Sequence, residues 1–429
     1  MERGSHEQAH DVAVVVVPIP AQLLHLSLLL CGRPGVSVHY ATSPTHIRQA
    51  KSRLHPAWGS GCVSQIRFHE LPIPAFPSPP PDLNSASTKF PTHFQPLFDV
   101  FEHLRTPLST LLPPRRRRSP QRGILRLPLR LGDELGDGGL SLPPLDGIVT
   151  EEIEVFARRQ LAEATSGAGT LINTCRPIEG EFIDDLLSRE PEHCDRKLFT
   201  VGPLSPMALL LNGGCHRQPH ECLGRSFYVS FGTTTSMSDE QVKELANGLL
   251  RSGQRFVWVL RDADRADIFT EEDNGNPQRM KLPPELEQKV EGTGMMVRGW
   301  APQLEILVHP SMGAFVSHCG WNSCMGVPMI AWPMHSDQPT NAALVTEHLK
   351  VGVTVREWTP HGDEVVGRAD IEEAIKRVMG LRGRESHKST SQGSGRSCSS
   401  GGRRGRSFAC RVRRLRCAHY QMMRALLLS

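Results

Sequence analysis

The chain has 429 residues, of which 38% are hydrophobic and 22% charged, enough for two domains with well-filled cores. Its longest early apolar run, Val12 to Val17, is too short to span a bilayer, and acidic residues precede it where a signal peptide has a basic start. The eleven cysteines are scattered and form no C-x-x-C pair, which favours reduced thiols over disulfides or structural zinc. These features predict a cytoplasmic protein with no membrane partner and no metal site.

The net charge of +4 is unevenly distributed along the chain. The last 49 residues, from Leu381, contain twelve Arg or Lys and one acidic residue, so the preceding 380 residues carry a net charge of −7. A mildly acidic folded part argues against a nucleic-acid partner. The tail is rich in Ser, Gly and Arg, which predicts disorder over residues 381–429. An RNA-binding arm would need aromatic side chains for stacking, and the tail has few.

The N-terminal domain, predicted over residues 1–200, opens with a β-α-β pattern. The continuous apolar run Asp11 to Val17 predicts a strand that is buried on both faces, Leu23 to Leu30 a short helix, and Val36 to Ala41 a second strand. This order is the unit of a parallel sheet. Two segments interrupt the pattern: the proline-rich stretch Pro77 to Pro81 predicts a loop, and residues 113–139 are arginine-rich and irregular.

A second parallel α/β domain is predicted over residues 226–380, after a linker at 201–225. Its expected strands are Phe227–Gly232, Arg255–Leu260, Met295–Val297, Gly313–Ser317 and Val327–Ala331. Its expected helices are Asp239–Arg251, Asn341–Leu349 and Ala369–Met379. In the first helix Val242, Leu245 and Leu249 fall on one face, as in an amphipathic helix that packs on a sheet.

The most informative segment runs from Trp300 to Gln338 and combines features suited to a nucleotide-sugar. The strand that ends at Ser317 is followed by a glycine turn, and a helix is expected to begin near Asn322. The free N–H groups and dipole of a helix start attract phosphate. Trp300 offers a broad face for a planar base, and the pair Asp337–Gln338 has polar groups for vicinal hydroxyls.

Each of these residues also has a simpler interpretation. A single Trp is more often core than a stacking platform, a His-Cys-Gly sequence is usually an ordinary turn, and Asp337 alone would be a helix cap. Their joint occurrence, in order, over 39 residues favours the nucleotide-sugar interpretation.

The segment resembles the signature box of plant family-1 UDP-glycosyltransferases. The motifs that carry the resemblance are Trp300-Ala-Pro-Gln303, Ser317-His-Cys-Gly-Trp-Asn-Ser323 and His335-Ser-Asp-Gln338. The stretches Met334–Pro339 and Ala343–Gly352 look most like the zeatin O-glucosyltransferase and O-xylosyltransferase branch. The resemblance implies an α/β GT-B fold, in which two Rossmann-like domains with parallel sheets face each other across a cleft. It places the acceptor on the N-terminal domain and the UDP-sugar on the C-terminal one.

The resemblance also implies roles for single residues. Trp300 would stack on uracil and Gln303 would support the ribose, whereas His318 and the turn that follows it would hold the diphosphate. Asp337 and Gln338 would bind the sugar, with the terminal Gln suggesting glucose or xylose. The predicted UDP-sugar-binding residues are Thr233, Trp300, Ala301, Gln303, His318, Gly320, Trp321, Asn322, Ser323, Asp337 and Gln338.

Several family features have no counterpart in this chain. Family members use a His in a Gly-His motif as general base and an Asp as its partner. Here Pro18-Ile-Pro-Ala-Gln22 runs directly into Leu23, and the segment expected to carry the Asp is replaced by residues 113–139. His25 is the one candidate substitute, although its place on the first helix favours packing. The signature box is shortened between Ser323 and Gly326, and the basic tail replaces the family's C-terminal helix.

Three hypotheses follow. The first is an inverting transferase that moves a sugar from UDP-glucose or UDP-xylose to a hydroxyl of a small acceptor, plausibly a cytokinin such as zeatin, without any further cofactor. The second is a catalytically dead or mispredicted relic that at most binds a uridine nucleotide, because the His and Asp segments are missing. The third is an Arg-rich interaction protein whose tail is the functional part.

Overall fold

The computed structural model of the protein describes most of both predicted domains. The described residues are 12–18, 23–54, 59–81, 90–111, 150–163, 169–189, 197–202, 204, 226–269, 282–323, 327–359, 364–391, 408, 410–412 and 414–415. The arginine-rich stretch 113–139 and the segment that follows Pro18 lie outside them, as does most of the predicted linker.

The N-terminal lobe contains a parallel sheet in the order β1-β2-β3, as the β-α-β pattern predicts. The prediction that the first strand is buried on both faces is wrong: β1 lies at the edge of this sheet, Val12 is 55% exposed, and burial is reached only at Val16. β1 pairs with β2 from Val12 opposite Val36, and β2 pairs with β3 from Val38 opposite Ile66. The strands and helices up to the middle of the lobe are β1 (Val12–Val16), α1 (Leu23–Cys31), β2 (Val36–Thr42), α2 (Pro44–Ser52), α3 (Gly59–Ser64) and β3 (Ile66–Glu70). The start of α2 is fixed by its sequence: Ser43 accepts a hydrogen bond from the His46 N–H, and Pro44 occupies the first turn.

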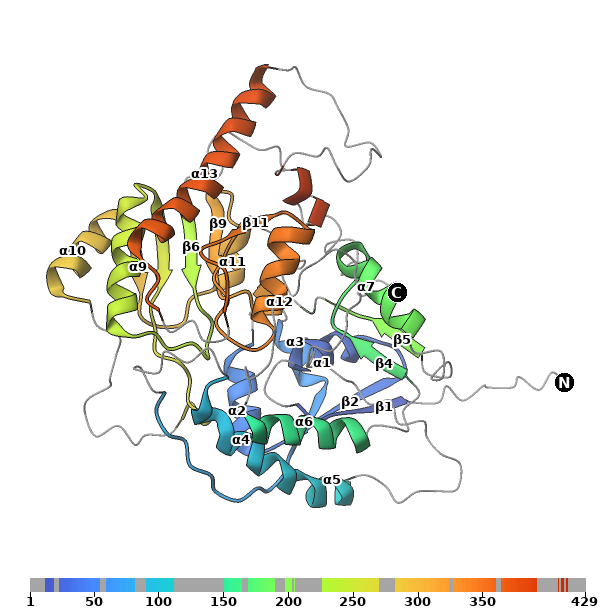
Figure 1. The fold of residues 1–429 in the computed structure, drawn as a ribbon. Coiled ribbons are helices and arrows are strands. Elements are labelled where there is room, and N and C mark those ends of the chain that lie inside the picture. The colour runs from blue at the N-terminus through green and yellow to red at the C-terminus, as the bar shows by residue number, and fades with distance from the viewer. Residues whose placement is uncertain are drawn as a thin grey trace.

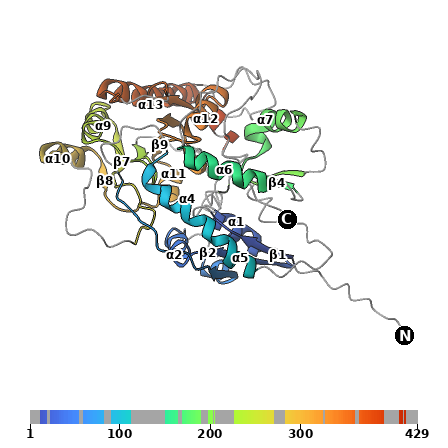
Figure 2. The same ribbon diagram turned by 60° about the horizontal axis from the view of Figure 1, so that its bottom comes forward.

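The rest of the lobe is mainly helical. Its elements are the 3₁₀ turns η2 (Thr92–Phe94) and η3 (Glu102–Leu104), the helices α4 (Gln95–Phe101), α5 (Arg105–Leu111), α6 (Glu151–Glu163) and α7 (Arg176–Arg189), and the strands β4 (Gly169–Ile172) and β5 (Lys197–Thr200). β4 and β5 form a parallel pair of their own. Helix α6 lies beside α4 (Figure 2).

The C-terminal lobe contains a six-stranded parallel sheet in the order β11-β10-β9-β6-β7-β8. Its strands are β6 (Ser226–Ser230), β7 (Arg255–Val259), β8 (Met295–Val297), β9 (Met312–Ser317), β10 (Met329–Ala331) and β11 (Gly352–Thr354). Its helices are α9 (Asp239–Arg251), α10 (Pro284–Thr293), α11 (Gln303–Val308), α12 (Gln338–Ala343) with the π-helical turn Leu344–His348, and α13 (Arg368–Ser391). The five strands and three helices expected above are present: Asp239–Arg251 and Met295–Val297 have the predicted bounds, and the others differ at their ends, most of all α13, which extends to Ser391. Where a further helix was expected to begin near Asn322, the described residues form the 3₁₀ turn Trp321–Ser323.

Helices cover both faces of this sheet (Figure 1). α9, α10 and α13 lie on one face, and α11 and α12 lie on the other. Every residue of β9 is buried, which explains why its sequence is continuously apolar rather than alternating. The apolar face of α9 is fully buried through Val242, Leu245 and Leu249, and Ser238 caps the helix by accepting from the Gln241 N–H at 3.2 Å.

The C-terminal tail differs from the predicted disorder where the structure describes it. Helix α13 continues past residue 380 to Ser391, and Phe408, Val412 and Leu415 are buried against a cluster that includes Cys175 and Ile178. These three apolar residues are spaced four and three apart, so they share one helical face. The average composition of the tail conceals this short stripe. Among the described residues, no helix has both the length and the apolar character that crossing a bilayer requires.

Candidate nucleotide-sugar site

Three neighbouring strands of the C-terminal sheet end side by side. Ser230 of β6 pairs with Ser317 of β9, and Ser317 is also level with Ala331 of β10. The strand order places β6 to β8 on one side of the sheet and β9 to β11 on the other, so the connections change direction between β6 and β9. Ligands of open parallel sheets bind outside the carboxyl ends of the strands at such a switch point. The segments 231–235, 318–323 and 332–338 therefore form one candidate site.

His318 directly follows β9 and its ring lies between two glycines. A Cβ on Gly232 would approach His318 Nε2 to 2.7 Å, and a Cβ on Gly320 would approach the same atom to 2.6 Å. Only glycine fits at either position without moving the ring, and Gly232 also has a φ of +77°. Burial lowers the pKa of His318 to about 4, and a hydrogen bond to the Ser230 backbone opposes this shift.

The other ring nitrogen of His318, Nδ1, has no hydrogen-bond partner among the described residues. A buried polar atom without a partner calls for an explanation, and a bound ligand is one. An anionic group beside Nδ1 would favour the protonated imidazolium, which then donates a hydrogen bond to it. The geometry therefore suits a diphosphate.

The turn after His318 is held by a small network. Cys319 has a φ of +65°, its N–H donates to Ser317 Oγ at 3.1 Å, and its carbonyl accepts from Asn341 Nδ2 at 3.0 Å. Trp321–Ser323 form a single 3₁₀ turn, and the Ser323 N–H donates to the Gly320 carbonyl at 2.8 Å. The prediction of a helix that begins near Asn322 is therefore wrong for the described residues. Any anion bound at this position would therefore meet a short turn and its side chains rather than the start of a long helix with its dipole.

The predicted base-binding residues lie at the start of α11. Trp300 is 64% exposed, so it is not a core residue and its face is open for stacking. The next residue, Ala301, is buried, and Gln303 is the first residue of α11. The Gln303 amide donates to Ser323 Oγ at 3.3 Å, which joins the base-binding and phosphate-binding segments. The structure thus brings these two halves of the motif together.

The third segment, 332–338, is organised around Gln338. Its side-chain oxygen accepts from the N–H groups of Met334 at 2.9 Å and His335 at 3.1 Å, so its amide nitrogen faces the His335 ring at 3.5 Å. Gln338 is 4% exposed and shapes this loop. Asp337 is exposed at the start of α12, where its carboxylate accepts from Asn341 Nδ2 at 2.9 Å. Asn341 therefore links Asp337 to the Cys319 turn.

The loop after β6 completes the site. Thr233 follows Gly232, and its carbonyl accepts from the Asp264 N–H at 2.7 Å. The neighbouring Thr234 hydroxyl lies 3.2 Å from His335 Nε2. Burial lowers the pKa of His335 to about 3, with smaller contributions from His318 and His93, so the ring is neutral at physiological pH. Sequence reasoning did not assign a role to His335, although it is part of the His335-Ser-Asp-Gln338 motif.

His25 is connected to this site only indirectly. Its Nδ1 lies 3.1 Å from the Leu204 carbonyl, and the Leu204 N–H donates to Asn173 Oδ1 at 2.8 Å. The Asn173 amide reaches Asn322 Oδ1 at 3.4 Å. These contacts fasten α1 to the segment between the lobes, which agrees with the expectation that His25 packs.

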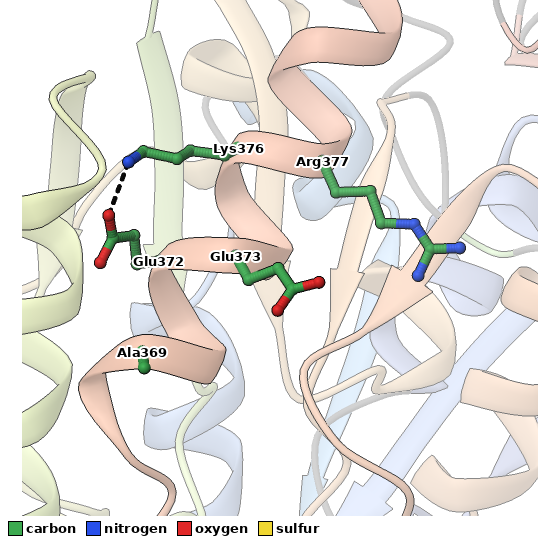
Figure 3. Close-up of a pocket in the computed structure, with 5 residues that line it drawn as sticks. All are labelled: Ala369, Glu372, Glu373, Lys376 and Arg377. Atoms are coloured by element: carbon green, nitrogen blue, oxygen red, sulfur yellow. Dashed lines mark hydrogen bonds and ion pairs between the residues drawn. The ribbon is translucent and has the colours of Figure 1, made fainter.

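A shallow groove elsewhere in the molecule has a different character. It lies on the outer side of α13 and is lined by Ala369, Glu372, Glu373, Lys376 and Arg377 (Figure 3). Lys376 and Glu372 pair at 2.5 Å along the helix, and the groove contains no aromatic side chain. The groove offers no ring for stacking a base, and its two glutamates offset the charges of Lys376 and Arg377.

Comparison with known families agrees with this geometry. The N-terminal domain profile of glycosyltransferases matches residues 10–124 and 129–206, and the profile of UDP-glucoronosyl and UDP-glucosyl transferases matches residues 225–385. The chain belongs to the UDP-glycosyltransferase family. It is 42% identical to cis-zeatin O-glucosyltransferase 2 of Zea mays, over 86% of this chain and 89% of that protein. It is 36% identical to the zeatin O-xylosyltransferase of Phaseolus vulgaris over the same share of each chain.

Solved structures confirm the GT-B fold of this UDP-glycosyltransferase. TcCGT1, crystallised in complex with UDP, superimposes with a TM-score of 0.63 at 21% identity, covering 97% of this chain and 95% of that one. UGT71G1 of Medicago truncatula, complexed with UDP-glucose, superimposes with a TM-score of 0.60 at 20% identity, covering 96% and 94%. The resemblance inferred from the motifs, to the family and to its zeatin branch, is confirmed.

Proposed function

We propose that this UDP-glycosyltransferase transfers glucose or xylose from a UDP-sugar to a hydroxyl group of a cytokinin such as zeatin. The proposal is supported by the strand ends at the β6/β9 switch point. There Gly232 and Gly320 enclose the His318 ring, and the Gln303 amide, three residues after the exposed Trp300, donates to Ser323 Oγ. The choice of acceptor is supported by the zeatin O-glucosyltransferases and O-xylosyltransferase among its relatives.

Within this proposal the C-terminal lobe holds the donor. Trp300 stacks on uracil beside Ala301, and Gln303 supports the ribose. His318, Thr233 and the turn formed by Gly320, Trp321, Asn322 and Ser323 hold the diphosphate. Asp337 accepts hydrogen bonds from sugar hydroxyls, and the Gln338 amide group donates one. The N-terminal lobe, over residues 1–200, takes the acceptor, and the reaction takes place in the cytoplasm.

The proposed reaction inverts the anomeric carbon. The acceptor oxygen attacks C1 of the sugar, the bond from C1 to the β-phosphate oxygen breaks, and its electron pair leaves with UDP. The hydroxyl proton passes to solvent or to His25, the one candidate substitute for the family's base; a positioned base contributes about 10²–10⁴-fold to such reactions. Donors around the diphosphate stabilise the charge that develops on the leaving group.

A direct assay tests the proposal. The purified chain is incubated with UDP-glucose or UDP-xylose and with cis- or trans-zeatin, and the products are identified by mass spectrometry alongside released UDP. Formation of a zeatin O-glycoside supports the proposal, and its absence with every donor and acceptor pair contradicts it. His25→Ala is included, and retention of its activity would agree with the packing role that the Leu204 contact indicates.

A second candidate function is nucleotide binding without turnover. It follows from the missing Gly-His and Asp segments, and the zeatin glycosyltransferases among the relatives do not favour it. Calorimetric binding of UDP, together with no product in the assay above, would select this alternative.

A further inference from the structure

Asp264 has every one of its polar atoms engaged, and the partners come equally from both lobes. From the C-terminal lobe, the Thr233 carbonyl accepts from the Asp264 N–H at 2.7 Å, and Arg261 donates to carboxylate oxygen Oδ1. From the N-terminal lobe, Arg53 of α2 donates to Oδ2 at 2.8 Å, and His93 Nε2 lies 2.9 Å from the Asp264 carbonyl. A carbonyl oxygen only accepts, so His93 is the donor in that contact.

The residues that follow Asp264 are docked on the N-terminal lobe. The Gln49 amide donates to the Ala266 carbonyl at 3.2 Å, and the Asp267 N–H donates to Ser78 Oγ at 2.8 Å. Ala266 is 2% exposed and packs in a cluster of N-terminal residues that includes Leu71 and Phe94. The Arg48 guanidinium lies 4.0 Å above the ring of Phe269. This segment of the donor lobe therefore packs in the acceptor lobe.

The charges in this contact fix its geometry. The Asp264 side chain is 7% exposed, and its carboxylate pairs with the guanidinium groups of both Arg53 and Arg261. Buried ion pairs add little net stability, but removing one partner leaves an uncompensated charge and is strongly unfavourable. Without the carboxylate, two like charges from opposite lobes would face each other.

We propose that Asp264 is a positioning residue that fastens the Thr233 turn of the donor site to the acceptor lobe, so that lobe docking and UDP-sugar binding are coupled. The inference rests on the proposed donor site. The Thr233 carbonyl accepts a backbone hydrogen bond from Asp264, and the adjacent Thr234 contacts His335, whose backbone N–H and ring both contact the Gln338 side chain. A shift of Asp264 is thereby passed to the diphosphate and sugar segments of the site.

Calorimetric titration of UDP into the full chain tests this coupling. The variants are Asp264→Asn, Arg53→Met and the double variant, and the matched control is Glu372→Gln, which breaks the 2.7 Å pair with Arg251 inside one lobe. Coupling between sites usually changes affinity by roughly 5- to 150-fold. We expect the UDP dissociation constant to rise at least about fivefold in each single variant and to stay unchanged in the control. In the double variant it should not exceed the larger of the two values measured for the single variants.

Thermal unfolding of the same samples separates positioning from a purely structural role. A structural role alone lowers the unfolding midpoint and leaves UDP affinity of the folded protein unchanged, and that result would overturn the inference. Arg53→Met provides the same test if Asp264→Asn does not fold, because Arg53 reaches the donor lobe through Asp264. Failure of the unaltered chain to bind UDP would instead overturn the proposed donor site, and the inference with it.

Discussion

Replacing Gly320 with alanine should weaken UDP binding by displacing His318. The new Cβ would lie 2.6 Å from His318 Nε2, whereas ordinary contacts begin at 3.4 Å, so the ring must move by about 0.8 Å. A hydrogen bond to a charged group contributes about 1.5–3 kcal/mol, and a shift of this size removes most of it. Since about 1.4 kcal/mol is a tenfold change in affinity, we expect the UDP dissociation constant to rise by roughly 10- to 150-fold.

Isothermal titration calorimetry with UDP measures this change, with urea unfolding as a check on stability. Gly292→Ala is the matched control, because nothing lies within 4 Å of its Cβ position. The double variant Gly320→Ala with His318→Ala should bind UDP no more weakly than His318→Ala alone, since each change removes the same contact between His318 and UDP. If Gly320→Ala bound UDP with the affinity of the unaltered chain, the argument that a glycine is needed here to leave room for the His318 ring would be refuted.

Four further outcomes are expected. Trp300→Ala should weaken UDP binding by about 1–3 kcal/mol, the value of a base stacked on an aromatic ring, with little change in stability because the side chain is 64% exposed. Trp258→Ala, at a fully buried position, should instead lower the free energy of unfolding by about 3–5 kcal/mol in urea titrations. Phe408→Ala should lower the free energy of unfolding by a similar amount, because Phe408 is 6% exposed in a core cluster, and an unchanged urea midpoint would contradict this packing. Burial lowers the pKa of His46 from 6.5 to about 4, so between these pH values the unfolded chain binds more protons than the folded one. The stability contributed by neutral His46 should therefore be complete above pH 6.5 and fall as the pH approaches 4. In urea titrations at stepped pH, His46→Gln should reduce this dependence of the unfolding free energy on pH.

The elements of the fold could largely be predicted because their sequences carry local signals. The apolar face of α9 and its Ser238 cap define that helix in a single stretch of chain. Continuous apolar runs likewise indicated buried parallel strands such as β9. Burial of Phe408 could not be predicted in the same way, because it depends on a surface formed by Cys175 and Ile178 more than two hundred residues earlier.

The sequence by itself determined the family, the two α/β lobes and the residue types of the candidate site, because the signature motifs lie within 39 consecutive residues. Tertiary structure decided how those residues are held. The glycines on either side of His318 come from two different strand ends, and Asp264 meets Arg53 and His93 across the lobe boundary. Contacts of this kind join segments that are far apart in the chain, and no local pattern of hydrophobicity or spacing records which distant partner a side chain will meet.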